Sequence, residues 1–345
     1  MPDRTQAPVI AITMGDPAGI GPEVILKAIR QARVRRALQP LLVGVADVFH
    51  DCARRSGWRL RLQEYEAGKP RDADAVWIYD IPSAAQLPRP GTPLTPAARK
   101  RCGEVSWRAL VAAVDLVQRG EAAALVTAPI AKAHWAAAGL KAPGHTELLA
   151  HLAGDVAVRM MMAGRRLRVV LMTTHVPLAK VPRLLTTQLV DETIRIAHRA
   201  LHEQFHLDSP RLAVAGLNPH AGEGGLFGRE DQEILLPAVT RARRRGIDVT
   251  GPLPADTVFF HAYRGMYDAV LCPYHDQALA PFKLVHFSDG VNVTLGLPFV
   301  RTSPDHGTAF DIAGQNRADA SSMTAALLLA AELARHQKTR NRQGK

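Results

Sequence analysis

The stretch "VIAITMGDPAGIGPEVILKAIR", from Val9 to Arg30, joins an apolar β-branched run, a glycine-rich turn and a helical segment in direct succession. This order is typical of α/β proteins. Its glycines have the spacing G-x-x-x-G-x-G, and Pro22 takes the first helical position, where a missing N–H costs nothing. The dinucleotide-binding fingerprint requires G-x-G-x-x-G instead. The stretch therefore predicts a strand, a turn and a helix, and a dinucleotide site has to be sought elsewhere in the chain.

Short β-branched runs continue to alternate with longer amphipathic segments along the chain. This alternation predicts an α/β architecture with a largely parallel sheet. Thr95 and Pro96 are expected to be the cap and the first residue of a long helix. The expected strands cover residues 9–13, 40–46, 75–80, 123–129, 167–174, 211–217, 268–273 and 291–297. The expected helices cover residues 96–119, 189–206, 229–245 and 320–336, and the Pro/Gly-rich segment 81–96 is expected to be a loop.

Length and composition predict a globular protein of about two domains, since the chain has 345 residues and 47% of them are hydrophobic. The apolar runs are too short to span a bilayer, and no apolar signal segment precedes the first strand, so we expect no membrane association. The three cysteines are scattered without a C-x-x-C pair. They predict a reduced, cytoplasmic compartment.

The formal net charge of +11 permits two interpretations. A basic protein can bind nucleic acid, but the Arg/Lys clusters here lie at expected helix ends and in the C-terminal tail. Aromatic residues make up only 5% of the chain, so stacking platforms for bases are scarce. We therefore expect no nucleic-acid partner, and a basic surface also suits anionic small molecules.

Three expected strands are each followed by a histidine just past the carboxyl end. His175 stands in "TTHVPL", His220 in "GLNPHAGEGG" and His275 in "PYHDQ". A single histidine of this kind is usually a structural or surface residue. Three in matching positions favour a divalent-metal site, because three protein ligands with one open position are typical of a catalytic metal. Asp256 and Asp276 are available as supporting partners or further ligands.

Two further segments are suited to anionic ligands. "PGHTELLA" opens a helix at His145 and Thr146, and a free helix N-terminus binds anions, although either residue could simply cap the helix. Lys283, Asn292 and Arg301 flank the last expected strand and can bind a phosphate or carboxylate; ordinary surface solvation is the alternative for each.

The segment "SPDHGTAFDIAG" forms a tight polar loop after the last expected strand. Gly307 allows the backbone to approach a planar ligand closely, and Asp311 can accept a hydrogen bond from a ribose hydroxyl. By itself the segment is not diagnostic of a dinucleotide.

Taken together, the motifs resemble those of the 4-hydroxythreonine-4-phosphate dehydrogenase family, which acts in pyridoxal phosphate biosynthesis. The family is distantly related to the isocitrate and isopropylmalate dehydrogenases. The resemblance implies an isocitrate/isopropylmalate-dehydrogenase-like α/β fold, with two domains, a cleft between them and a homodimer. It rests on "GDPAGIGPE", "GHTE", "TTHVPL", "GLNPHAGEGG", "GPLPADT", "YHDQ", "VNVTLGLPFVRTS" and "DHGTAFDIAG", in that order between about residues 9 and 325.

The resemblance also implies roles for particular residues. It makes His175, His220 and His275 ligands of one divalent metal ion, shared across the dimer interface. The implied substrate-binding residues are His145, Thr146, Lys283, Asn292 and Arg301. The implied cofactor-binding residues, in the late loop rather than the early glycine turn, are His306, Gly307, Thr308, Asp311 and Gly314.

The implied reaction is the oxidation of 4-phosphooxy-L-threonine by NAD or NADP, followed by decarboxylation to 3-amino-2-oxopropyl phosphate. A metal held by histidines would lower the pKa of the substrate alcohol, and zinc or cobalt suits such ligands better than magnesium. Lys283, Asp256 and a metal-bound water are the candidates for the catalytic proton acceptor.

Two questions stay open in the sequence. The family commonly has glycine where Asn316 stands in "QNRAD", so the choice between NAD and NADP is undecided. The alternative function is a dehydrogenase of 4-phospho-threonate or 4-phospho-erythronate in sugar-acid catabolism. A related branch that oxidises a terephthalate-derived dihydrodiol lacks "GHTE" and is disfavoured.

The spread of the motifs also predicts the domain organisation. For the early turn and the late loop to share one site, the two ends of the chain must fold together. We expect a cofactor-side domain from residues 1–137 plus 286–337 and a metal, substrate and dimerisation domain from 138–285. Residues 338–345 are expected to be a disordered tail.

Overall fold

The computed structural model describes residues 7–72 and 74–343, and it divides into two compact α/β units. The first unit comprises residues 1–156 and 297–338, and the second comprises residues 157–296 with 339–345. The two ends of the chain thus contribute to one unit, as the spread of the motifs indicates. The α/β class and the eight expected strands are confirmed.

The first unit is built on six strands in the order β3-β4-β2-β1-β5-β12. β1 pairs in parallel with β2 and β5, and β12 pairs in parallel with β5. Its strands are β1 (Val9–Thr13), β2 (Gln39–Gly44), β3 (Leu62–Glu64), β4 (Val76–Asp80), β5 (Ala124–Thr127) and β12 (Val300–Pro304). Its helices are α1 (Gly21–Ile29), α2 (Ala32–Ala37), α3 (Ala46–Arg55), α4 (Pro96–Gln118), α5 (Lys132–Ala137), α6 (His145–Leu152) and α12 (Ser321–Gln343), the last of which runs past the unit boundary.

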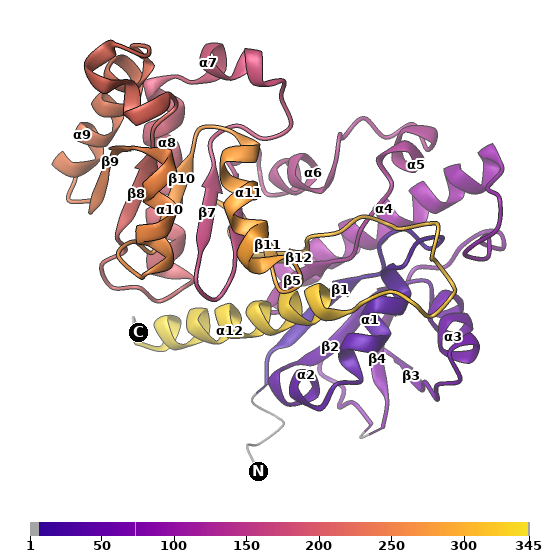
Figure 1. Ribbon diagram of the computed structural model, residues 1–345. Helices are drawn as coiled ribbons and strands as arrows, with labels where there is room; N and C mark the ends of the chain where they lie inside the picture. The colour runs from indigo at the N-terminus through magenta and orange to yellow at the C-terminus, as the bar shows by residue number, and fades with distance from the viewer. Residues whose placement is uncertain (1–6, 73, 344–345) are drawn as a thin grey trace. The chain divides into compact units, whose positions relative to one another are not determined.

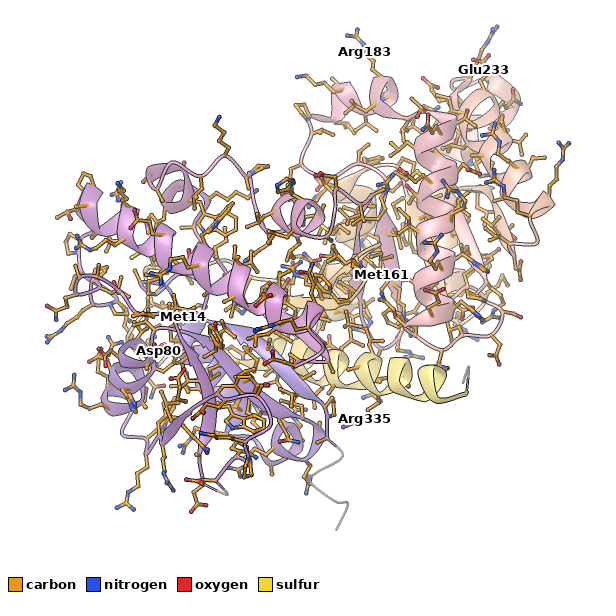
Figure 2. All side chains as sticks on the ribbon, turned by 180° about the vertical axis from the view of Figure 1, so that it is seen from behind. Met14, Asp80, Met161, Arg183, Glu233 and Arg335 are labelled. Atoms are coloured by element: carbon orange, nitrogen blue, oxygen red, sulfur yellow. The ribbon has the colours of Figure 1, made fainter. Side chains whose placement is uncertain are left out.

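Helices cover both faces of this first sheet, as buried parallel strands require. Helices α1, α2 and α3 lie on one face (Figure 1), and α4 packs on β1, β2 and β5 from the other, as the rear view shows (Figure 2). The Thr95 side chain caps α4 by accepting a hydrogen bond from the Ala98 N–H at 3.2 Å, as expected. Thr302 Oγ1 donates to the Ala326 carbonyl at 2.9 Å and anchors α12 on β12.

The second unit has six strands in the order β11-β6-β7-β10-β8-β9. β6 runs antiparallel to both its neighbours, and the remaining pairs are parallel. The strands are β6 (Arg159–Ala163), β7 (Arg168–Leu171), β8 (Leu212–Ala215), β9 (Val249–Leu253), β10 (Ala269–Cys272) and β11 (Val291–Leu295). The helices are η2 (Leu178–Lys180), α7 (Val181–Leu184), α8 (Thr187–Glu203), η3 (Pro219–Gly225), η4 (Asp231–Leu235), α9 (Leu236–Arg244), α10 (Ala255–Tyr263) and α11 (His275–His286).

The core of the second unit lies between its sheet and the helices α10 and α11, which Figure 1 shows in orange in front of the strands. Phe282 of α11 and Val258 of α10 are fully buried there against Val169 and Val270 of the sheet. The helices α8 and α9 pack on each other, and α8 also contacts β6 and β11.

The unit boundaries differ from the expected division at 137/138 and 285/286. The segment 138–156 falls in the first unit, where Gln118 Nε2 of α4 donates to the Leu152 carbonyl of α6 at 3.0 Å. The segment 286–296 falls in the second unit because β11 pairs with β6 over its whole length. Residues 338–343, expected to be disordered, continue α12, and residues 344–345 lie outside the described residues.

The cysteines and the apolar helices bear on the expected compartment and on the expected absence of a membrane span. Cys52, Cys102 and Cys272 are free and buried, as expected of small core residues. No helix among the described residues is both long enough and apolar enough to cross a bilayer.

Candidate active site

The three strand-end histidines follow three neighbouring strands of the second unit. β10 lies between β7 and β8 and is parallel to both, so the three carboxyl ends meet at one edge of the sheet. His175 follows β7, His275 follows β10 and His220 follows β8. In open α/β sheets this edge is where ligands bind.

Backbone and side-chain hydrogen bonds continue the β7–β10 pairing beyond the strands themselves. The Met172 N–H donates to the Cys272 carbonyl at 2.9 Å, and Thr173 Oγ1 donates to the Pro273 carbonyl at 2.7 Å. The two chain segments therefore leave the sheet side by side. As a result the rings of His175 and His275 lie with their centroids 5.4 Å apart.

The tautomer of His275 is controlled by the next residue. Asp276 Oδ1 lies 2.7 Å from His275 Nδ1, so the carboxylate favours a proton on that nitrogen. The lone pair is then on Nε2, which is the arrangement that carboxylates impose on metal-binding histidines. His175 is exposed and His275 is partly exposed, so both imidazoles are accessible to an ion.

The loop that carries His220 has an unusual backbone. His220, Ala221 and Glu223 have φ angles of 53°, 53° and 40°, a left-handed conformation that costs L-residues energy. Buried Asp231 anchors the loop, because its carboxylate accepts the N–H groups of Leu217 and Asn218 at 2.8 and 3.1 Å. Strain that is held in place in this way is typical of binding sites.

His220 nevertheless does not complete a three-histidine group within one chain. Among the described residues, only Asp16, Cys102 and His134 place three potential ligand atoms within 4.8 Å of one another. His175 and His275 thus form a pair to which a single chain adds no third close ligand of this kind.

The Asp16–Cys102–His134 cluster lies in the first unit and is completely buried. His134 Nδ1 already lies 2.6 Å from Asp16 Oδ2. Burial raises the pKa of the Cys102 thiol to about 12, with a smaller contribution from the Asp16 charge. A metal binds a cysteine as the thiolate and a histidine through a nitrogen without a proton. Because Cys102 stays protonated and His134 Nδ1 faces Asp16, we interpret this cluster as a structural contact.

The two proposed proton acceptors also belong to the second unit. Lys283 lies on α11 with Nζ 5.9 Å from the centroid of the Phe287 ring. Asp256 is exposed in the first turn of α10, and its carboxylate has no hydrogen-bond partner within residues 7–72 and 74–343. Asn292 lies on β11 opposite Met162 of β6. These placements leave the identity of the acceptor open.

The "GHTE" motif forms the start of α6 in the first unit. Neither Thr146 nor His145 caps this helix, because its cap residue, Gly144, is extended and no side chain accepts a cap hydrogen bond. The N–H groups of the first turn are therefore free to bind an anion.

Arg301 is held on β12 beside β5, where it pairs with Leu125. Its side chain is buried, and Nη2 donates to Thr127 Oγ1 at 2.6 Å. Burial lowers the pKa of Arg301 to about 10, so the guanidinium is still charged at neutral pH. A buried cation of this kind is expensive unless an anion compensates it.

His145 is a neutral polar group close to that cation. Burial, followed by the charges of Arg301 and Lys132, lowers the pKa of His145 well below its ordinary value. Its Nε2 atom is buried and has no hydrogen-bond partner among the described residues. The indole of Trp135 packs edge-on against the ring, with centroids 5.5 Å apart. The imidazole is therefore held in place with one nitrogen unused.

Lys132, the first residue of α5, lies close to the start of α6, and the sequence analysis did not single it out. A Cβ added at Gly144 would lie 3.2 Å from Lys132 Cε, so the lysine stem passes directly beside the start of α6. Lys132 has no carboxylate partner within 4.0 Å in the described part of the chain. It stands outside every recognised motif, and only its positive charge near "GHTE" was available as a signal.

The predicted cofactor loop, residues 306–314, joins β12 to α12 and rests on the early glycine turn. The Ile20 N–H donates to the Thr308 carbonyl at 3.0 Å, and a Cβ added at Gly19 would lie 2.9 Å from that oxygen. Gly307 faces open space, and the Asp311 carboxylate has no partner among the described residues. The loop thus presents an open glycine and a carboxylate that has no partner in the described part of the chain.

The turn that follows Gly314 contains the "QNRAD" departure from the family pattern. Asn316 has a φ of 58°, and asparagine tolerates this left-handed conformation better than most residues. The Asn316 carbonyl accepts from Lys27 Nζ at 3.0 Å, and Glu23 Oε1 accepts from the Ala318 N–H at 2.8 Å. Asparagine therefore keeps the backbone path that a glycine would take.

Comparison with known proteins shows the family to which the chain belongs. The family model described as "Pyridoxal phosphate biosynthetic protein PdxA" matches residues 36–330. The chain belongs to the PdxA family. It is 49% identical to the 4-hydroxythreonine-4-phosphate dehydrogenase of Geobacter metallireducens, over 95% of this chain and 96% of that protein.

Other members of the PdxA family agree. The enzyme of the same name from Paracoccus denitrificans is 49% identical, over 96% of this chain and 99% of that protein. The crystal structure of the Klebsiella pneumoniae 4-hydroxythreonine-4-phosphate dehydrogenase has a TM-score of 0.86 and 40% identity, covering 95% of this chain and 98% of that one. The PdxA resemblance and the α/β fold are thereby confirmed.

Proposed function

We propose that the protein oxidises 4-phosphooxy-L-threonine with NAD or NADP and that the resulting β-keto acid loses carbon dioxide to give 3-amino-2-oxopropyl phosphate. Membership of the PdxA family supports this activity. The structural observation that carries the assignment is the buried Arg301 guanidinium, whose charge acts on His145, together with the buried His145 Nε2, which has no hydrogen-bond partner among the described residues. Such a pair suits a doubly charged phosphate, which a plain hydroxy acid lacks.

The phosphate would be bound in the first unit. Arg301 and Lys132 supply charge, and His145 and the free N–H groups at Thr146 supply hydrogen-bond donors. A neutral imidazole can donate from one nitrogen without adding a third positive charge. Lys283 and Asn292 of the second unit remain proposed substrate contacts.

The divalent metal would be held by His175 and His275 of one chain together with His220 of another. Its chemistry, when bound, is to lower the pKa of the substrate alcohol and to polarise the ketone. The protein's own part is to fix the imidazoles. The continued β7–β10 pairing sets the positions of His175 and His275, and Asp276 sets the tautomer of His275. The donor set of neutral imidazoles suits zinc or cobalt, and magnesium less well.

The dinucleotide would bind along the 306–314 loop, with the Asp311 carboxylate accepting from a ribose hydroxyl and Gly307 allowing close approach. When bound, the dinucleotide would supply the acceptor for a hydride from the alcohol carbon, and the alcohol proton would pass to a basic group. Lys283 and Asp256 are the candidate acceptors among the described side chains.

The proposed function is tested by following NADH and NADPH formation with a panel of metals. Two substrates, 4-phosphooxy-L-threonine and 4-phospho-threonate, differ in the amino or hydroxyl group at the second carbon. We expect the amino acid to be preferred. A preference for 4-phospho-threonate would favour the sugar-acid alternative, and no reduction with either acid would contradict the assignment.

We infer that the active form is a homodimer, because the described residues of one chain bring only His175 and His275 of the three histidines together. The second unit also exposes apolar side chains on and after α11: Leu284 is 88% exposed and Phe287 is 80% exposed. A second copy of the chain would cover them. The three cysteines are free and buried, which is consistent with the proposed reduced compartment.

Leu284→Asp is expected to produce a monomer that is folded but inactive and depleted of metal, because a buried carboxylate opposes association. Leu284→Met, which conserves volume, should remain a dimer. Sedimentation at working concentration and metal analysis check both variants. An active wild-type monomer would contradict the shared site.

Lys132→Ala is expected to raise the KM for the phosphorylated substrate about tenfold or more, since one charge-assisted contact contributes roughly 1.5–3 kcal/mol. Lys132→Arg should keep most of the affinity. Lys141→Ala is the matched control, because Lys141 is exposed and lies between α5 and α6. It should leave the KM unchanged. Steady-state kinetics at saturating dinucleotide provide the measurement, and equal effects of the two alanine variants would remove Lys132 from the site.

A further inference from the structure

The proposed reaction makes no use of a buried hydrogen-bonded pair in the first unit, Asp16 and His134. Asp16, in the glycine turn, is fully buried, and His134, in α5, is 4% exposed. His134 Nδ1 lies 2.6 Å from Asp16 Oδ2, and the other carboxylate oxygen accepts from the Ala18 N–H at 3.0 Å. A buried carboxylate depends on such partners, because an unsatisfied one costs free energy.

The other face of the His134 ring contacts the predicted cofactor loop. Phe310 of that loop lies over the imidazole, with ring centroids 5.3 Å apart and planes tilted by 35°. The same loop is bonded to the glycine turn through the Thr308 carbonyl and the Ile20 N–H. His134 is therefore a side chain that touches the turn through Asp16 and the loop through Phe310.

Helix α5, which carries His134, is packed tightly against α4. A Cβ added at Gly103 of α4 would lie only 2.1 Å from the His134 carbonyl oxygen, so the α4 and α5 backbones are in direct contact. Trp135 Nε1 donates to Ser106 Oγ at 2.9 Å and ties the next residue to α4 as well. Movement of α5 cannot easily compensate for a change in the His134 side chain.

We propose that His134 is a positioning residue that holds the 306–314 loop against the glycine turn and thereby presents the loop to the dinucleotide. This inference rests on the proposed function only for the identity of the ligand. The Nδ1–H group fixes the ring on Asp16, and the ring face then supports Phe310 in an otherwise exposed loop.

The chemistry of the contact suggests a matched pair of variants. His134→Asn keeps an N–H donor near the position of Nδ1, because the asparagine amide nitrogen occupies a similar place on the side chain. His134→Leu has comparable volume but no donor. The asparagine variant keeps the hydrogen bond to Asp16 but loses the ring that contacts Phe310, whereas the leucine variant keeps apolar bulk beside Phe310 but loses the hydrogen bond.

The experiment measures amide hydrogen exchange of residues 303–315 in the dinucleotide-free dimer, and the dinucleotide dissociation constant by titration calorimetry. We expect His134→Leu to raise both the exchange rate and the dissociation constant about five- to tenfold, the effect of one lost hydrogen bond. The KM for the phosphorylated substrate and the metal content should stay within about twofold, the spread of unrelated surface changes. His134→Asn should recover the part of both losses that comes from the hydrogen bond to Asp16.

Unchanged exchange in His134→Leu, or an Asn variant no better than Leu, would overturn the proposal. If His134→Leu does not fold, Phe310→Ala tests the same contact from the exposed side, and it should raise the exchange of residues 14–21. An unchanged exchange there would overturn the proposal too. Failure of the wild-type protein to bind any dinucleotide would refute the proposed function, whereas the exchange results would still judge the role of His134.

Discussion

Removal of the divalent metal by a chelator is expected to abolish dehydrogenation, with a loss on the order of a thousandfold or more. Lewis-acid stabilisation contributes several kcal/mol to such a barrier, and each 1.36 kcal/mol corresponds to about tenfold in rate. Adding back zinc or cobalt should restore activity. The measurement is the initial rate of dinucleotide reduction before and after chelation.

Alanine variants of the three histidines assign that metal to its ligands. His220→Ala, His175→Ala and His275→Ala should each bind less metal than the wild-type dimer, measured by elemental analysis of the purified proteins. His151→Ala is the control, because that histidine is exposed in the first unit, where its Nδ1 lies 2.9 Å from Asp155 Oδ1. Full occupancy in all three site variants would rule out the proposed ligand set.

The second large effect concerns the phosphate. Arg301→Gln is expected to lower kcat/KM for the phosphorylated substrate about 10- to 150-fold, because a charge-assisted hydrogen bond contributes roughly 1.5–3 kcal/mol. The unphosphorylated analogue should react slowly with the wild type and no more slowly with Arg301→Gln. The loss caused by removing the substrate phosphate and the loss caused by Arg301→Gln should therefore not add, because each change removes the partner of the other group.

Arg99→Gln, an exposed arginine near the start of α4, provides the control for a simple loss of positive charge. It should leave kcat/KM unchanged. Equal rates with and without the phosphate group would eliminate the anion site around Arg301, and an equal loss in Arg301→Gln with both substrates would indicate a structural rather than a binding role.

Much of the fold was predictable because its signals are local. The run Val9–Thr13 is β1 with the same bounds, and the Thr95 cap begins α4 as expected. β-branched runs, caps and glycine turns act over a few residues, so their pattern can be read without knowing the packing. The strand-end positions of His175, His220 and His275 followed from the same signals.

Four strands were missed for reasons of context. The β6 segment "RMMMA" is not β-branched, and it is a strand because it pairs with β11 and β7 on both sides. β12 was not expected because Arg301 was placed beside the last expected strand, residues 291–297, whereas its buried side chain donates to Thr127 Oγ1 from within a strand of its own. β3 and β9 were likewise not expected, and both are edge strands whose pairing on one side makes them strands.

By itself the sequence determined the α/β class, eight of the twelve strands that the structure describes, the family and the strand-end histidines, because each depends on residues close together in the chain. Only the tertiary structure decided that Lys132 joins His145 and Arg301, that His134 pairs with Asp16, and that His175 and His275, but not His220, are neighbours. Those contacts join residues that are far apart in the chain, such as Asp16 and His134, which are 118 positions apart. Such contacts depend on how strands are ordered and helices are packed, and that order is set by burial over the whole unit rather than by any local pattern.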